Sequence, residues 1–110
     1  MLGLGQSGEK KAEKYLISQG YDVLEKNFRC KFGEIDLIAQ KDGVLVFVEV
    51  KTRSGSGYGM GFESVTKKKQ EKLLLTAQTY MAGRKPLQAR FDVISIDKGE
   101  ITHIKNAFGA

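Results

Sequence analysis

The dipeptide Asp42-Gly43 is the feature that most constrains how this chain folds. It lies between two runs rich in β-forming residues, GEIDLIAQK before it and VLVFVEVKTR after it. An Asp-Gly pair in this setting favours a two-residue type I′ turn, which joins two antiparallel strands. The stretch from Gly33 to Arg53 is therefore predicted to be a β-hairpin.

The turn also fixes the register of the hairpin, because the residues that flank it must face each other. Counting outward from there pairs Asp36 with Glu49 and Glu34 with Lys51. The period-two alternation of a strand places these four side chains on one face of the sheet. The opposite face is predicted to be wholly apolar and consists of Ile35, Leu37, Ala39, Val46, Val48 and Val50.

The charges on the first face need a compensating partner. Carboxylates that oppose each other directly, such as Asp36 and Glu49, destabilise a sheet because their Cβ atoms are only about 4.5 to 5.5 Å apart. Carboxylate oxygens that converge at this spacing suit Mg²⁺ or Mn²⁺, and the ammonium of Lys51 lowers the cost further. The pattern therefore favours a metal-binding cluster at the end of the hairpin far from the turn.

The alternative is an exposed polar face, on which Glu34 and Lys51 form a weak cross-strand pair. The same face also carries three large apolar residues, Ile38, Leu45 and Phe47. Large apolar residues predict that another element covers this face. Carboxylates at the edge of a covered face are unusual, so they favour the functional cluster over the exposed hairpin.

Composition limits the class of protein. The 110 residues are predicted to form a single domain, 1–110, with a core that needs no disulfide. A net charge of +5 favours an anionic partner. The single cysteine, Cys30, fits a reducing cytoplasm, and the lone histidine, His103, is assigned no role. No apolar run approaches the roughly 20 residues that span a bilayer, so we expect a cytoplasmic protein without a membrane partner.

Helical and strand patterns flank the hairpin on both sides. Helices are predicted from Ser7 to Gln19 and from about Thr66 to Ala82. Strands are predicted over 21–29 and 90–96, and a short one over 101–104. The second helix has the length of a right-handed crossover between parallel strands. The order is thus one helix, three antiparallel strands, a helix, a strand and a short terminal strand, which predicts an α/β fold with a mixed sheet of four to five strands flanked by helices.

Other charged residues have two readings that the sequence leaves open. Glu9 lies at the N-terminal end of the apolar stripe of the first helix, where it either joins the carboxylates or only complements the helix dipole. Lys67, Lys68 and Lys69 crowd the first turn of the second helix, where cations are disfavoured, so they indicate either an anionic ligand or a solvated face. The glycine-rich stretch 54–61 is predicted to be a flexible loop and lacks the Gly-Lys-Ser/Thr of a nucleotide-binding loop.

Together these residues resemble the PD-(D/E)XK nuclease superfamily, which has an aspartate followed by Glu-X-Lys and, in resolvase-like branches, a helix carboxylate. Here the corresponding residues are Asp36, Glu49-Val50-Lys51 and Glu9. The chain is also similar to the bacterial YraN-like family, whose members are mostly described as inferred endonucleases. This similarity is carried by the segments GEIDLIA, FVEVKTR, RFDV and NAF. The resemblance covers nearly the whole chain and implies a three-layer restriction endonuclease-like core.

The resemblance also implies a metal site. Asp36 and Glu49 would be ligands of Mg²⁺ or Mn²⁺, the backbone carbonyl of Val50 would be another, and Glu9 would complete the site. The chain departs from the superfamily pattern at Ile35, which stands where the motif has a proline. This loss is frequent in the superfamily and does not by itself argue against activity.

The function implied is a metal-dependent endonuclease that acts on DNA, with branched or damaged DNA as a candidate substrate. Lys51 would orient the attacking water or contact the phosphorus centre, while Arg53, Lys67, Lys68 and Lys69 would hold the flanking phosphates. Resolvase-like relatives are dimers, so a homodimer is compatible with the resemblance. The alternative function is a non-catalytic nucleic-acid-binding or assembly module that retains the nuclease fold.

Overall fold

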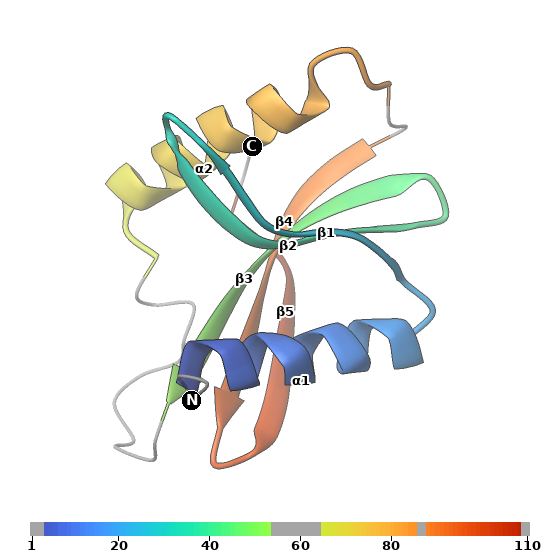
Figure 1. Ribbon diagram of the computed structural model, residues 1–110, viewed down its shortest axis with the longest axis vertical. Helices are drawn as coiled ribbons and strands as arrows, with labels where there is room; N and C mark the ends of the chain where they lie inside the picture. Colours follow the sequence, from blue (N-terminus) through green and yellow to red (C-terminus); the bar gives the residue numbers. More distant parts are fainter. Residues whose placement is uncertain (1–3, 54–64, 86–87, 109–110) are drawn as a thin grey trace.

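The computed structural model describes residues 4–53, 65–85 and 88–108. Within these ranges the chain forms two helices and five strands (Figure 1). In chain order they are α1 (Leu4–Ser18), β1 (Asp22–Cys30), β2 (Gly33–Lys41), β3 (Val44–Arg53), α2 (Lys67–Met81), β4 (Gln88–Asp97) and β5 (Glu100–Phe108). The predicted glycine-rich loop, 54–61, lies outside the described residues.

The hairpin of β2 and β3 forms at the predicted turn. Asp42 and Gly43 have φ values of 53° and 81°, as a type I′ turn requires, and glycine reaches this conformation without strain. The residues that flank the turn pair with each other, and the ladder continues to Leu37 opposite Val48. The predicted register is confirmed over this length.

Two of the predicted helix boundary signals are found, at the start of α2 and at the end of α1. The side chain of Thr66 caps α2 by accepting a hydrogen bond from the backbone N–H of Lys69 at 3.2 Å. The end of α1 is confirmed at Ser18, just before Gly20, which has φ 90°. Its start differs, because the helix begins at Leu4 and not at the predicted Ser7.

The strands form one mixed sheet in the order β1-β2-β3-β4-β5. β3 and β4 run parallel, whereas the other neighbours are antiparallel, because α2 supplies the long crossover that a parallel pair needs. The two helices cover opposite faces of the sheet (Figure 1). The α2 side of the core contains Ile38, Phe47, Leu73, Tyr80 and Phe91, and the α1 side contains Ala12, Leu16, Leu37, Val48 and Ile94. The predicted α/β class, element order and mixed sheet are confirmed.

β2 does not keep one face towards the same helix along its whole length. Ile35 packs in the α2 side of the core, not on the α1 side with Leu37, so its predicted face is wrong. The reason is that β2 leaves the β3 ladder after Leu37 but stays paired to β1, where Phe28 faces Ile35. Asn27, beside this pair in β1, has a left-handed backbone with φ 54°, so the strand pair is irregular at this level. The alternation therefore breaks at Asp36.

The last two strands are longer than predicted. β4 begins at Gln88 instead of Arg90, and β5 runs to Phe108 instead of ending at Ile104. The ring of Phe108 stacks on that of Phe91, with ring centroids 4.9 Å apart, which gives the end of β5 an apolar anchor. In the described part of the chain, neither helix has the length and apolar character needed to cross a membrane.

Candidate functional site

The site begins where β2 and β3 separate. Asp36 is the first β2 residue beyond the ladder, which ends at Leu37 opposite Val48. Its Oδ2 accepts a hydrogen bond from the backbone N–H of Val50 at 2.8 Å. A side-chain carboxylate thus satisfies a β3 amide at the split and fixes the Asp36 carboxyl group between the two strands.

The predicted proximity of Asp36 and Glu49 is found at the level of side chains. The two carboxyl groups lie close enough for each to shift the pKa of the other, although the described backbone ladder stops one pair earlier. Glu49 lies on the α2 side of β3 and is only 8% exposed. The two carboxyl groups therefore meet in a mostly dry place, where each strongly affects the proton affinity of the other.

The pKa values of Asp36 and Glu49 shift in opposite directions. Burial and the neighbouring carboxyl group of Glu49 raise the pKa of Asp36 to about 8, with a smaller contribution from the charge of Glu9. Burial also pushes the pKa of Glu49 upward, but hydrogen bonds from Asp36 and Lys69 outweigh it and leave this pKa below its usual value. The pair therefore holds a proton more readily than two separate carboxyl groups would, and the two lysines beside Glu49 favour the negative charge on that residue.

Two lysines compensate the charge of Glu49. Lys69, in the first turn of α2, places its Nζ 2.6 Å from Glu49 Oε2, whereas Lys51 Nζ lies 3.6 Å from the same atom. Burial and the neighbouring Lys69 lower the pKa of Lys51. Burial opposes the charge on Lys69 too, but its hydrogen bonds with Glu49 and Lys51 prevail and raise its pKa. Lys69 is thus the lysine in closest contact with Glu49, although the sequence analysis predicted that it holds the flanking phosphates.

The predicted pairing of Glu34 with Lys51 is wrong. Glu34 forms an exposed ion pair with Arg29 of β1, with Nε and Oε2 2.8 Å apart. These two residues face each other in the β1–β2 ladder. β2 has already separated from β3 at this level, so Glu34 follows β1 away from the site.

Glu9 reaches the neighbourhood of the site because of Gly8. A Cβ atom at Gly8 would lie 2.1 Å from Thr52 Oγ1, so only glycine allows α1 to approach β3 this closely. Glu9 is partly buried there, and its charge raises the pKa of Asp36. Over the described residues, no three acidic, histidine or cysteine side chains are close enough together to hold a metal ion, so Glu9 is near the carboxyl pair without completing a triad.

The remaining predicted phosphate contacts lie around this cluster. Lys67 and Lys68 are exposed on the first turn of α2. Arg53 ends β3, and its backbone lies opposite Asp97 of β4. The side chain of Arg53 is outside the described part of the structure, so its predicted role stays a prediction.

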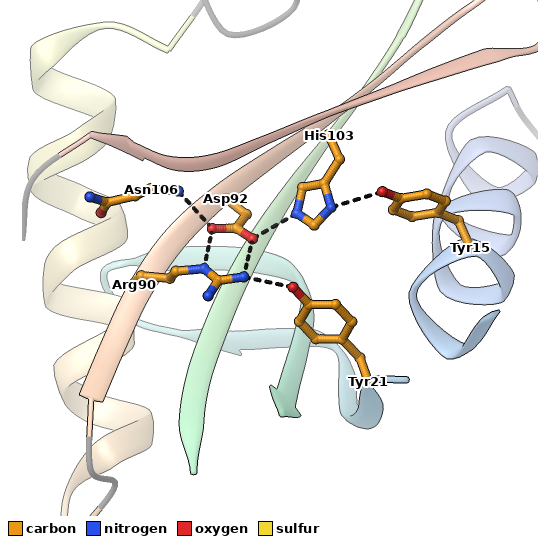
Figure 2. Close-up of polar contacts among 6 residues, drawn as sticks. All are labelled: Tyr15, Tyr21, Arg90, Asp92, His103 and Asn106. Carbon is orange, nitrogen blue, oxygen red and sulfur yellow. Dashed lines mark hydrogen bonds and ion pairs between the residues drawn. The ribbon is translucent and has the colours of Figure 1, made fainter. Parts of the chain in front are cut away.

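A second polar cluster, which the sequence did not reveal, lies on the α1 side of the sheet around Asp92 (Figure 2). Asp92 is 1% exposed and accepts hydrogen bonds from Arg90 Nε at 2.9 Å and from the backbone N–H of Asn106 at 2.9 Å. His103 Nε2 lies 2.7 Å from the other carboxylate oxygen and donates to it, because a carboxylate only accepts. Burial raises the pKa of Asp92, but the hydrogen bonds from His103 and Arg90 outweigh burial and lower it.

This second cluster ties α1 to the sheet. The hydroxyl of Tyr15 lies 3.1 Å from His103 Nδ1, and Arg90 donates to the hydroxyl of Tyr21 at 2.7 Å. Asp92 also holds the irregular segment of β5, where Asn106 has φ 53°. The signal in the sequence was an aspartate inside the apolar strand RFDVISI, since a buried carboxylate requires donors from elsewhere.

Comparison with known proteins assigns the amino-acid sequence to a family. Residues 8–96 match the uncharacterised protein family UPF0102. The chain belongs to the UPF0102 family. The UPF0102 protein of Persephonella marina is 51% identical over 106 residues, which cover 94% of this chain and 91% of that protein. A UPF0102 protein of Caldanaerobacter subterraneus subsp. tengcongensis is 46% identical over 114 residues, covering 96% of this chain and 93% of that protein.

The UPF0102 match spans the whole carboxylate and lysine cluster. It begins at Gly8, which brings α1 against β3, and it includes Asp36, Glu49 and Lys69. It also contains Asp92, whereas His103, a partner of Asp92, lies beyond its end. The family match therefore covers the elements that bring the site together.

Proposed function

We propose that this chain is a metal-dependent endonuclease that hydrolyses phosphodiester bonds in DNA, with branched or damaged DNA as the first substrates to test. The observation that carries the proposal is the meeting of the Asp36 and Glu49 carboxyl groups at the split between β2 and β3. Lys51 lies beside them, as the resemblance to PD-(D/E)XK nucleases implies.

The donor set fits a hard divalent cation. Mg²⁺ binds through one or two carboxylates and keeps several waters, so Asp36 and Glu49 suffice without a third acidic ligand. The carbonyl of Val50 would add a third oxygen, and Glu9, which does not complete a triad among the residues that the structure describes, would have to move closer from α1 to become a further ligand. A bound Mg²⁺ or Mn²⁺ ion would polarise the phosphodiester and lower the pKa of a bound water.

The protein's own groups would position the substrate. Lys51, partly buried beside Glu49, would orient the attacking water or contact the phosphate that is cut. The exposed lysines Lys67 and Lys68, together with Arg53, would hold neighbouring phosphates without reading the base sequence. Substrate choice would then follow the shape of the DNA.

The test is cleavage of plasmid, flap, junction and single-stranded DNA in the presence and absence of Mn²⁺. We expect cleavage to require the metal, and Asp36→Asn and Lys51→Ala each to lower it by at least about a hundredfold, because each removes a group at the reacting phosphate. DNA binding, measured in Ca²⁺, should remain largely intact. Asp42→Asn is the matched control, since it makes the same substitution in the exposed turn of the hairpin.

Robust cleavage by Lys51→Ala would rule out the assigned mechanism. A second readout addresses the alternative of a non-catalytic nucleic-acid-binding module. A metal site predicts that Mn²⁺ raises the melting temperature of the wild-type protein and not that of Asp36→Asn. The absence of any metal response, together with intact DNA binding, would favour the binding module.

A further inference from the structure

Lys69 differs from the two lysines that precede it in α2. Lys67 and Lys68 are exposed, whereas Lys69 is partly buried and its ammonium points into the carboxyl pair. The side chain of Thr66 accepts a hydrogen bond from the backbone N–H of Lys69 and so orders the first turn of the helix, and the ion pair with Glu49 ties this turn to β3. Lys69 is therefore part of the site and not of the exposed basic surface.

The contact between Lys69 and Glu49 is the closest charge contact of the site. Lys69 Nζ lies 2.6 Å from Glu49 Oε2, which is 1.0 Å closer than the motif lysine Lys51 at 3.6 Å. The Glu49 side chain is only 9% exposed, so water cannot replace this partner easily. Without a metal ion, the main counter-charge of Glu49 thus comes from α2.

An ammonium and a divalent cation cannot both occupy the same side of one carboxylate oxygen. Glu49 has a second carboxylate oxygen, but a metal ion bound to either oxygen would lie within a few ångströms of the ammonium on Oε2, and two cations this close repel strongly in a partly buried site. A metal ion that uses Glu49 as a ligand is therefore expected to displace Lys69 from it. The exposed part of the Lys69 side chain, 39% of its surface, leaves room for that movement.

We infer that Lys69 is an internal counter-cation that occupies Glu49 until a divalent metal displaces it, and that the displaced ammonium then contacts the phosphate of the DNA. This inference rests on the proposed metal-dependent nuclease. It gives Lys69 two opposite effects. The lysine weakens metal binding, because its ion pair must be broken, and it assists cleavage, because its charge is then delivered to the substrate.

The experiment measures Mn²⁺ affinity of the metal-free protein by calorimetric titration, beside cleavage at saturating Mn²⁺. Lys69→Met removes the charge and keeps the length of the side chain, and Lys72→Met is its matched control on an exposed position of the same helix. We expect Lys69→Met to bind Mn²⁺ at least about threefold more tightly and to cleave at least about tenfold more slowly. Lys72→Met should match the wild-type protein in both.

Two further variants separate charge from structure. Lys69→Arg keeps the charge and should restore Mn²⁺ affinity to near the wild-type value. Lys68→Ala should weaken DNA binding and leave Mn²⁺ affinity unchanged, because Lys68 is directed to solvent. This pair distinguishes a counter-cation at Glu49 from a general contribution of the basic helix end.

Each outcome is decisive. Equal Mn²⁺ affinity in Lys69→Met and the wild-type protein would overturn the inference and leave the proposed nuclease standing. Weaker Mn²⁺ binding together with slower cleavage would also overturn it, since that combination indicates a structural role. No Mn²⁺ binding by the wild-type protein would overturn both the inference and the proposed function.

Discussion

Asp36 and Asp92 are both aspartates within the same sheet, but their surroundings are opposite. Asp92 is almost fully buried and is held by Arg90, His103 and the backbone N–H of Asn106 (Figure 2). Asp36 receives one backbone N–H and faces a second carboxyl group, that of Glu49. The pKa of Asp92 is lowered, and that of Asp36 is raised to about 8.

The difference teaches how to distinguish a structural carboxylate from a candidate functional one. A buried charge is stable only where hydrogen bonds and opposite charges replace water, and Asp92 has both. Asp36 lacks a cation of its own, since both lysines of the cluster contact Glu49. Such a deficit of positive charge is costly to the fold, which is common where a site is kept for function.

The substitution with the largest expected effect on stability disrupts the Asp92 cluster. Asp92→Asn should lower the free energy of unfolding by about 3 kcal/mol, because it removes a buried anion that Arg90, His103 and the backbone N–H of Asn106 all contact, and leaves the partly buried charge of Arg90 without it. Urea unfolding at pH 7 measures this, with Asp42→Asn as the control for the same chemical change in an exposed turn. A loss below about 1 kcal/mol would mean that the cluster is not a structural anchor.

The next effect concerns the approach of α1 to the site. Gly8→Ala should cost about 1 to 2 kcal/mol, because the new Cβ meets Thr52 Oγ1 and the clash outweighs the better helix propensity of alanine. In a Thr52→Ala background most of this cost should disappear, because the hydroxyl is removed and only the Cβ at position 52, 3.3 Å from the new methyl group, remains close. Urea unfolding of the four proteins of this cycle provides the measurement, and an equal cost in both backgrounds would contradict the proposed contact.

The smallest expected effect concerns how the ionisation of Asp36 makes stability depend on pH, in contrast to Asp92. In the folded protein the pKa of Asp36 is raised from 3.8 to about 8, so its contribution to stability falls as pH rises between these values. Asp36→Asn removes this penalty and should stabilise the protein by about 1 kcal/mol at pH 9, with little change at pH 4. Melting temperatures at the two pH values measure the difference.

Asp92 should behave in the opposite sense. Its pKa is lowered on folding, so the stability that it contributes is present above its unfolded pKa near 4 and is lost as pH falls further. If Asp36→Asn destabilised the protein at pH 9, the two aspartates would play the same structural role.

The sequence by itself determined the features that depend on neighbouring residues. The Asp42-Gly43 turn set the register of β2 and β3, Thr66 marked the start of α2, and the apolar periodicity gave the order of elements. From that register alone, Asp36 could be placed beside Glu49. These predictions succeeded because turn geometry and helix capping act over only a few residues.

Only the tertiary structure decided the features that depend on distant parts of the chain. The separation of β2 from β3 moved Ile35 to the α2 side, and the close packing of α2 brought Lys69 to Glu49. The partners of Asp92 come from 2 to 14 positions away along the chain, and the hydroxyl that supports His103 belongs to Tyr15, 88 positions away. Such contacts follow from how layers pack, because burial and charge compensation act across space and not along the sequence.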